Sequence, residues 1–224
     1  MGKLIVIEGL DSSGKETQSR LLTQNLKKIG KNVMRCEFPN YKSSSSELVK
    51  MYLSGAFGKS AGDVNAYAAS SFYAVDRYAT FKTELEDFYK LGGIIIADRY
   101  TTSNIIHQAG KITDEAELDK YLDWLCDFEY NLLGLPCPDA VVFLDMPPQT
   151  GIKLMENRKN KAGGDQKDIH ERDRKYLFDT YDCAKKMVSR FEWQTVMCTD
   201  GEAVRTIENI QEDVIKYALK ALEA

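Results

Sequence analysis

The chain has 224 residues, of which 43% are hydrophobic and 29% are charged, and its net charge is −4. This size and composition are typical of one soluble globular domain, and the acidic balance argues against a general nucleic-acid binder. No apolar run approaches the ~18 residues of a membrane span and no basic-then-apolar leader is present, so we expect a cytoplasmic protein with no membrane partner.

Apolar, β-branched segments alternate with longer helical patterns along the chain. We expect strands at about 3–8, 32–37, 93–98, 139–145 and 194–199, and helices at about 14–29, 45–54, 65–91, 101–109, 114–134, 148–158, 168–191 and 203–222. Such alternation indicates an α/β fold, a parallel sheet of about five strands with helices on both faces. We find no internal repeat and no linker, so the prediction is one domain over residues 1–224.

A glycine-rich loop follows the first expected strand. It reads Gly-Leu-Asp-Ser-Ser-Gly-Lys-Glu-Thr over residues 9–17, which is the spacing of a phosphate-binding loop placed between a strand and a helix. The two glycines allow a tight turn in which backbone N–H groups point at phosphate oxygens, and the next helix adds its positive N-terminus. The predicted ATP phosphate-binding residues are Gly9, Ser12, Ser13, Gly14, Lys15, Glu16 and Thr17.

One position of this loop departs from the usual motif. The residue after the lysine is ordinarily Ser or Thr, whose hydroxyl holds Mg²⁺, but here it is Glu16, with Thr17 one step later. A carboxylate can ligate Mg²⁺ directly or through water. It can equally be an acidic residue that the helix dipole stabilises, so the metal ligands stay open at this stage.

The expected helix at 65–91 carries an aromatic residue and an arginine on one face. Tyr73 and Arg77 are four residues apart, so they are neighbours on the helix surface. A ring and a guanidinium can stack on a nucleobase and hydrogen-bond its exocyclic oxygen. Core packing together with Phe72 and Tyr78 explains the pattern equally well.

Two buried strands end in charged residues. The third expected strand ends in Asp98-Arg99-Tyr100, and the fourth ends in Asp145. Open α/β folds bind ligands at the carboxyl edge of the sheet, so Asp98 is a candidate for holding Mg²⁺ or its waters. Arg99 is a candidate for a bidentate clamp on an acceptor phosphate. The alternatives are a helix cap for Asp98 and a surface ion pair for Arg99.

A basic, glycine-containing stretch lies between the sixth and seventh expected helices. Around Gly163-Gly164 stand five cations, namely Arg158, Lys159, Lys161, Lys167 and Arg172. We interpret residues 158–168 as a lid whose closure brings a cation over the transferred phosphoryl group. Arg158 is the first choice because it ends the preceding helix, although a charge run can also be only a solvated surface.

The cysteines favour a reducing compartment. Five cysteines are widely spaced, without a Cys-x-x-Cys pair, and the chain has only two histidines. The sequence therefore disfavours a structural zinc site or a disulfide framework and indicates reduced thiols.

Four elements together resemble the thymidylate kinase family. They are the phosphate-binding loop with Asp11, the triplet at 98–100 followed by Ser103-Asn104 and Gln108, the run Phe-Leu-Asp-Met-Pro-Pro at 143–148 before Gly151, and Thr199-Asp200-Gly201 before an acidic helix. The loop is common, but all four in this order are specific and span nearly the whole chain. The resemblance implies a P-loop NTPase-type fold, ATP- and Mg²⁺-dependent phosphorylation of thymidine monophosphate, and a homodimer.

The resemblance also implies roles for residues at matching positions. Asp11 would meet the sugar 3′-hydroxyl, and Arg99 would hold the acceptor phosphate. Tyr73 falls at the thymine-stacking position and Arg77 at the position of the base-recognising arginine. Further expected substrate contacts come from the loop after the second strand and from the helix after the third, namely Phe38, Pro39, Asn104, His107 and Gln108.

At three positions this chain has a residue that differs from one common in the family. Ser12 stands where one subgroup carries a loop arginine, so the chain resembles the subgroup whose lid supplies that charge, which favours Arg158. His107 stands where many members have a tyrosine beside the deoxyribose. Asn40 stands where a basic residue is common, so the acceptor phosphate would be bound by Lys42 or by Arg99 alone.

These observations predict a thymidylate-kinase-like nucleoside monophosphate kinase that uses ATP and Mg²⁺. Its expected catalytic residues are Lys15, Asp98, Arg99 and Arg158, acting on a direct in-line attack of the acceptor phosphate. A deoxynucleoside kinase shares the loop and the lid, but it would not need the triplet at 98–100. A nucleotide-binding protein with weakened catalysis is a further alternative, for which Glu16 and His107 are the best arguments.

Overall fold

The fold is built around a central parallel sheet. A computed structural model describes residues 1–162 and 174–223. The sheet has five strands in the order β2-β3-β1-β4-β5, and all four neighbouring pairs are parallel. This confirms the predicted α/β class. The strands are β1 (Lys3–Gly9), β2 (Val33–Glu37), β3 (Ile94–Asp98), β4 (Ala140–Asp145) and β5 (Gln194–Met197).

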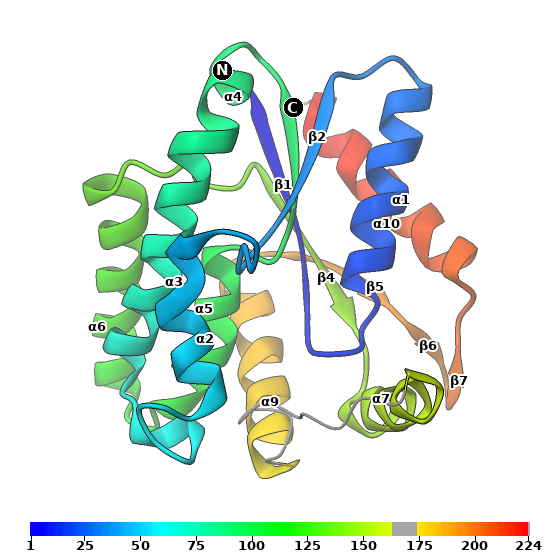
Figure 1. Cartoon of the computed structure of the whole chain (residues 1–224). Helices are drawn as coiled ribbons and strands as arrows, with labels where there is room; N and C mark the ends of the chain where they lie inside the picture. Colours follow the sequence, from blue (N-terminus) through cyan, green and yellow to red (C-terminus); the bar gives the residue numbers. More distant parts are fainter. Residues whose placement is uncertain (163–173, 224) are drawn as a thin grey trace.

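Helices lie on both sides of this sheet, with α1 and α10 together on one side (Figure 1). The α-helices are α1 (Lys15–Lys28), α2 (Glu47–Ser54), α3 (Ala66–Thr80), α4 (Glu86–Lys90), α5 (Thr101–His107), α6 (Glu115–Cys126), α7 (Pro148–Ala162), α9 (Arg174–Arg190) and α10 (Ile207–Glu223). Two π-helical segments, η3 (Phe81–Leu85) and η5 (Asp127–Leu132), continue α3 and α6. Short 3₁₀ turns are η1 (Ser44–Ser46), η2 (Ala61–Asp63) and η4 (Ala109–Lys111).

The central strand is apolar on both of its faces. Successive side chains of a strand point to opposite sides, so Ile5 and Ile7 pack into the core beneath α1 and α10. Leu4 and Val6 pack into a second core on the opposite face, together with residues of η3. All four side chains are buried, as the middle strand of a sheet covered on both sides requires.

Three expected helices are interrupted or begin later in the structure. The helix expected at 65–91 consists of α3, η3 and α4 in succession, and the one expected at 114–134 consists of α6 and η5. Apolar spacing does not distinguish the i→i+4 bonds of an α-helix from the i→i+5 bonds of a π turn. The helix expected at 203–222 starts at Ile207, because β7 (Ala203–Val204) pairs with β6 (Thr199–Asp200) in a small hairpin.

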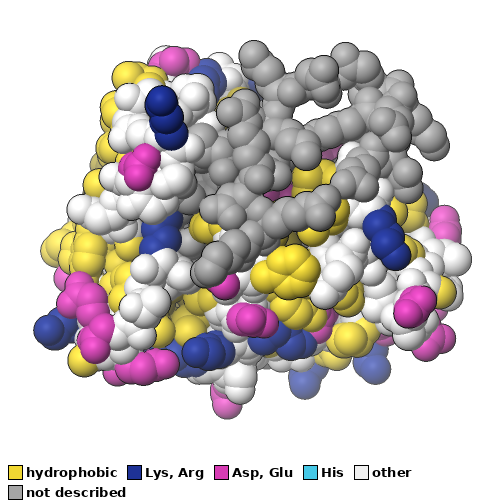
Figure 2. Space-filling model, turned by 90° about the horizontal axis from the view of Figure 1, so that it is seen from below, with side chains coloured by type: hydrophobic (Ala, Val, Ile, Leu, Met, Phe, Trp, Pro, Cys, Tyr) yellow, Lys and Arg dark blue, Asp and Glu magenta, His cyan; other side chains and the backbone are white. Residues whose placement is uncertain are grey.

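The carboxyl ends of the strands meet at one edge of the molecule. In Figure 1 the chain runs down β1 to this edge, turns there, and returns upward through α1. Both termini lie at the opposite end. Figure 2 views the carboxyl edge directly and shows acidic and basic side chains interspersed with hydrophobic ones. Ligand sites of open α/β sheets lie at this edge, so the predicted site residues should converge here.

The expected lid at 158–168 lies only partly within the described chain. Residues 158–162 continue α7 beyond its expected end at 158, and residues 163–168 lie outside the described residues. The last expected long helix, 168–191, is described from Arg174 to Arg190 as α9. Within residues 1–162 and 174–223, no helix has the length and apolar character that crossing a bilayer demands.

Candidate active site

The glycine-rich loop joins β1 to α1 at the carboxyl edge of the sheet. Gly9 has φ 152°, and a Cβ there would lie 2.6 Å from Ser13 Oγ and 2.9 Å from the carbonyl oxygen of Leu144. Gly14 caps α1 in the left-handed region at φ 92°. Both positions therefore require glycine. Ser13 Oγ is buried and has no hydrogen-bond partner among the described residues, so the loop holds a polar atom that a ligand can satisfy.

Lys15 is the first residue of α1 and is held inside the loop. Its Nζ donates a hydrogen bond of 2.7 Å to the carbonyl oxygen of Leu10, and the residue is only 7% exposed. Burial, with a smaller contribution from the positive charge of Arg99, lowers the pKa of Lys15 to about 8, although nearby carboxylates oppose the shift. Lys15 is therefore a buried donor whose charge an incoming phosphate would stabilise.

This lowered pKa predicts a pH dependence of ATP binding. Phosphate oxygens favour the charged ammonium, so the pKa of Lys15 rises when ATP binds and a proton is taken up above about pH 8. We expect the affinity for ATP to fall by up to about tenfold per pH unit between pH 8 and 9.5. Titration calorimetry in buffers of different ionisation enthalpy measures both the affinity and the proton uptake.

Lys111 offers a matched control for this titration. Burial also lowers its pKa to about 8, but it contacts Tyr52 and the carbonyl oxygen of Val64 outside the loop. Replacing Lys111 with Ala should leave the pH dependence intact, whereas Lys15→Arg should remove it. A pH-independent affinity in the wild-type protein would contradict the assignment of Lys15 to the phosphates.

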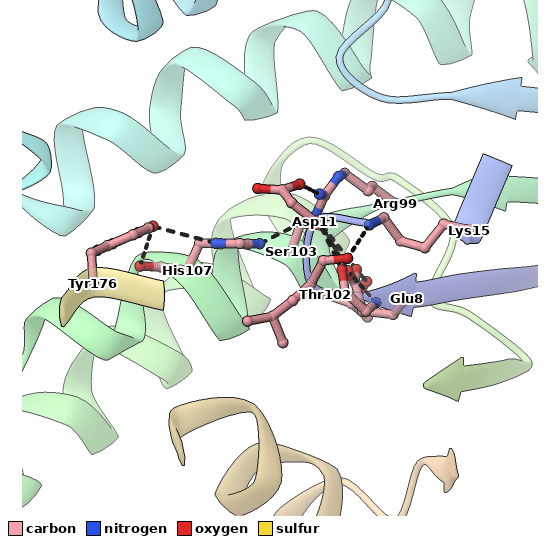
Figure 3. Close-up of polar contacts among 10 residues, drawn as sticks. Glu8, Asp11, Lys15, Arg99, Thr102, Ser103, His107 and Tyr176 are labelled. Carbon is pink, nitrogen blue, oxygen red and sulfur yellow. Dashed lines mark hydrogen bonds and ion pairs between the residues drawn. The ribbon is translucent and has the colours of Figure 1, made fainter. Parts of the chain in front are cut away.

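Arg99 lies directly behind the loop and faces its first residues (Figure 3). Its backbone has φ 66°, and its N–H donates to the carbonyl oxygen of Ile7. The guanidinium is ion-paired with Asp11, lies 3.7 Å from Glu8, and donates to His107 Nε2 at 3.2 Å. The side chain is 19% exposed, so it lines the site and is no surface ion pair. Burial opposes its charge, but the surrounding carboxylates raise the pKa of Arg99 further.

Glu8 is a residue of this site that the sequence analysis did not single out. It ends the apolar part of β1 and is fully buried. Its carboxylate accepts hydrogen bonds from Thr102 Oγ1 at 2.6 Å, from Ser103 Oγ at 2.9 Å and from the N–H of Gly9 at 3.0 Å (Figure 3). Glu8 thereby ties the loop to the start of α5. The sequence signal that could have identified Glu8 is a charged residue at the end of an otherwise apolar strand.

Asp98 ends β3 and is paired with an arginine of the neighbouring strand. Arg35 Nη2 lies 3.2 Å from Asp98 Oδ2, and Arg35 Nε donates to Ser19 Oγ. The N-cap of α5 is Tyr100, so the alternative in which Asp98 caps that helix is wrong. Its carboxylate lies at the carboxyl edge, as predicted. Arg35 is a further residue that the sequence analysis missed.

Glu16 lies on the outer side of α1. Its carboxylate is 66% exposed and lies 3.9 Å from Arg20 in an i,i+4 pair. Among the described residues no three His, Cys, Asp or Glu side chains cluster as a metal site. Mg²⁺ in nucleotide sites takes only one or two carboxylates together with substrate phosphates and water. Asp98 supplies one carboxylate, which is compatible with that donor set. Glu16 is less well placed as a metal ligand because its carboxylate is largely exposed.

All nine predicted substrate residues line one cavity behind the loop. They are Asp11, Phe38, Pro39, Tyr73, Arg77, Arg99, Asn104, His107 and Gln108. Residues from four separate stretches of the chain thus meet around a single space. Gln108 Oε1 in this cavity is buried and has no hydrogen-bond partner among the described residues. The cavity therefore presents an acceptor that suits the N–H of a ligand.

Arg77 is held more tightly than its expected place on a helix surface implies. It is 2% exposed, and its Nε and Nη2 each donate a hydrogen bond of 2.7 Å to Glu129. Its guanidinium carbon lies 5.9 Å and 5.6 Å from the ring centres of Phe38 and Tyr100. Burial disfavours its charge, but Glu129 raises the pKa of Arg77 above the ordinary value. Glu129 was not predicted from the sequence.

His107 connects Arg99 to α9. Arg99 donates to Nε2, and Tyr176 Oη lies 3.3 Å from both Nδ1 and the carbonyl oxygen of His107 (Figure 3). Because Arg99 can only donate, Nε2 accepts and the neutral ring carries its proton on Nδ1. His107 thus helps to hold the guanidinium of Arg99 at the cavity.

Two further observations delimit the site. The backbone of Arg158 lies in the last turns of α7, but its side chain falls outside the described structure. A larger cavity of about 500 Å³ lies between β4, β5 and α10 and contains none of the predicted site residues.

The sheet order, the phosphate-binding loop after β1 and the charged strand ends define a P-loop nucleotide kinase. Comparison with known proteins agrees. The sequence profile of the thymidylate kinase family matches residues 7–213. The chain therefore belongs to the thymidylate kinase family, and it is a nucleoside monophosphate kinase that uses ATP.

Individual relatives cover most of the chain. It is 30% identical to a thymidylate kinase of Mycobacterium tuberculosis over 76% of this chain and 78% of that protein. It is 27% identical to a thymidylate kinase of Plasmodium falciparum over 98% of this chain and 90% of that protein. A thymidylate kinase structure from Candida albicans has a TM-score of 0.70 at 23% identity, with 99% of this chain and 92% of that one covered, which shows the shared fold.

Proposed function

We propose that the chain transfers the γ-phosphoryl group of ATP to the phosphate of thymidine monophosphate, giving ADP and thymidine diphosphate. One observation supports this most strongly. All nine expected substrate residues line one cavity, which includes Asp11 of the loop, and Arg99 in its wall is ion-paired with Asp11. The acceptor and the donor would therefore meet end to end across Arg99.

The acceptor phosphate would bind at Arg99. An arginine presents two parallel N–H donors that match two phosphate oxygens. Asp11 now occupies one of these donors, so the nucleotide phosphate would displace it. Asp11 would then accept a hydrogen bond from the 3′-hydroxyl of the sugar. Its exchange between Arg99 and the sugar would couple the binding of the phosphate to that of the deoxyribose ring.

The thymine base would bind at the far end of the cavity. Arg77 has one terminal nitrogen, Nη1, for which the described structure shows no hydrogen bond, and Gln108 Oε1 is an unsatisfied acceptor. A carbonyl next to an N–H offers the complementary acceptor and donor, and thymine carries that pair at positions 4 and 3. Tyr73 would supply a ring for stacking, Asn104 would line the sugar and base pocket, and His107 would lie beside the sugar.

Phosphoryl transfer requires positioned cations more than covalent chemistry. Lys15 would bind the β- and γ-phosphates, and Arg99 would bind the attacking phosphate. Bound Mg²⁺ would neutralise charge on the donor phosphates; Asp98 would hold it or its waters, and Glu16 is the second candidate. Asp98 would also keep Arg35 at the edge of the loop, since the two are already paired.

We further propose that residues 158–168 act as a lid of one kinase domain spanning the whole chain. Arg158 is the residue expected to bring a positive charge to the transferred group. Arg158 lies in the last turns of α7, and the first turn of this helix lies against the loop, where a Cβ on Gly151 would be 3.3 Å from the carbonyl oxygen of Asp11, which supports this role. The five cysteines are free thiols, which favours the reducing cytoplasm as the place of the reaction.

A homodimer is supported by an apolar surface on two adjacent helices. Leu48 and Met51 are exposed on α2, and Val75 and Tyr78 are exposed on α3, each pair three residues apart. We propose that this surface is covered by a second copy of the chain. Light scattering would then give twice the chain mass of 25.4 kDa.

The proposed reaction is tested by a panel of acceptors with Mg²⁺ and ATP. We expect ADP release with thymidine monophosphate to exceed that with deoxycytidine monophosphate by at least about 10²-fold, because cytosine carries a donor at position 4. Activity confined to the unphosphorylated nucleoside would favour a deoxynucleoside kinase. Binding of ATP without turnover on any acceptor would favour a nucleotide-binding protein with weakened catalysis.

A further inference from the structure

Glu129 is a fully buried carboxylate that the proposed reaction does not use directly. It lies on η5, the π-helical continuation of α6, whose other buried residues are Leu118, Tyr121, Leu122 and Leu125. A charge on an apolar helix face is costly unless it is paired. Replacing such a pair with apolar residues is often neutral for stability, so its presence here calls for another explanation.

Four hydrogen bonds converge on this carboxylate. Arg77 donates through Nε to Oε2 and through Nη2 to Oε1, both at 2.7 Å. Thr101 Oγ1 donates to Oε2 at 2.6 Å, and Asn104 Nδ2 donates to Oε1 at 3.3 Å. Both oxygens are thus satisfied by residues of α3 and α5. Two of the donors, Arg77 and Asn104, also line the substrate cavity.

The pairing constrains how Arg77 can act. Two of its three nitrogens bind Glu129, and its guanidinium carbon lies 5.9 Å and 5.6 Å from the ring centres of Phe38 and Tyr100, which are 5.7 Å from each other. The two bonds to Glu129 fix the orientation of the guanidinium, and the remaining nitrogen, Nη1, has no hydrogen bond among the described residues. The negative charge of Glu129 also offsets that of the guanidinium, so Arg77 presents a fixed hydrogen-bond donor rather than a free cation that would attract a phosphate. The phosphate is left to Arg99 at the other end.

We propose that Glu129 is the positioning residue of the base site: it fixes Arg77 and Asn104 so that the cavity selects a carbonyl at position 4 of a pyrimidine. This inference rests on the proposed function. It differs from a purely structural role because it ties Glu129 to the choice of base. The π turn supports it, since such turns are frequent at functional sites and here place a carboxylate among apolar residues.

The test compares two acceptors that differ mainly at position 4 of the base, thymidine monophosphate and 5-methyl-deoxycytidine monophosphate. The ratio of their kcat/KM values is measured for the wild-type protein and for Glu129→Gln. Glutamine keeps the shape but can accept from Arg77 through only one atom. We expect the ratio to fall at least about tenfold, and KM for thymidine monophosphate to rise about tenfold, while KM for ATP changes less than about twofold.

A second variant provides the test if Glu129→Gln does not fold. Thr101→Val removes the 2.6 Å hydrogen bond to Oε2, together with a side-chain hydrogen bond to Tyr130, and leaves the ion pair in place. We expect the selectivity ratio to fall about threefold in this variant, again with little change in KM for ATP. A general loss of structure would instead lower kcat with both acceptors and raise both KM values, leaving the ratio unchanged.

The outcomes separate the two proposals. A wild-type protein without activity on thymidine monophosphate would overturn the proposed function and this inference with it. An active wild-type protein whose folded Glu129→Gln and Thr101→Val variants keep the wild-type ratio would overturn the role of Glu129 alone. If Glu129→Gln does not fold, the ratio in Thr101→Val decides.

Discussion

Replacing Lys15 with Ala should lower kcat at least about 10³-fold. The donor phosphates would lose the positively charged side chain that the loop, residues 9–17, provides. The protein should still fold. Lys15 is a buried charge with a lowered pKa, so its removal relieves a desolvation cost and leaves only the carbonyl oxygen of Leu10 without its partner. The measurement is a coupled ADP-release assay at saturating substrates, together with a thermal unfolding curve.

Lys111→Ala is the matched control for this prediction. Lys111 is another lysine whose pKa burial lowers to about 8, but it lies outside the loop and the substrate cavity. Its replacement should change turnover by less than about fivefold. Turnover in Lys15→Ala within tenfold of wild type would remove the loop lysine from the mechanism.

Replacing Arg99 with Lys should lower kcat/KM for thymidine monophosphate about 10³-fold while KM for ATP stays within about threefold. Lysine keeps the charge opposite Glu8 and Asp11 but lacks the planar pair of donors that matches a phosphate. Steady-state kinetics with each substrate varied in turn measures the effect.

A surface arginine provides the control for Arg99. Arg190 pairs with Asp119 at 2.6 Å on the exposed side of α9, away from the substrate cavity. Arg190→Lys should leave both KM values unchanged within about twofold. An Arg99→Lys variant that keeps the wild-type KM for thymidine monophosphate would show that the acceptor phosphate binds elsewhere.

Much of the sheet follows from local patterns. The run Leu4–Ile7 is apolar throughout, which fits a central strand covered on both faces, and Gly9 and Gly14 mark the turn that follows. The charged ends of β3 and β4 then place the site at the carboxyl edge. Because parallel strands bring all of these ends together, residues far apart in sequence could be assigned to one cavity.

The partners of the site residues could not be predicted in this way. Arg77 and Glu129 are separated by 52 positions, and Arg35 and Asp98 by 63. Each pair depends on how whole helices and strands pack. The spacing of residues within one segment of the sequence does not indicate this packing. The π turns that break the helices expected at 65–91 and 114–134 are missed for the same reason. Tertiary packing, rather than propensity, decides their hydrogen-bond register.

The central claim is that two nucleotides meet end to end, one on the loop at Lys15 and the other in the cavity behind Arg99. A bisubstrate compound in which adenosine and thymidine are joined through five phosphates tests this most directly by titration calorimetry. Our account predicts one molecule bound per chain, at least about 10²-fold more tightly than ATP, with displacement by both ATP and thymidine monophosphate. Binding no tighter than ATP alone, or persistent binding of thymidine monophosphate beside the compound, would contradict it.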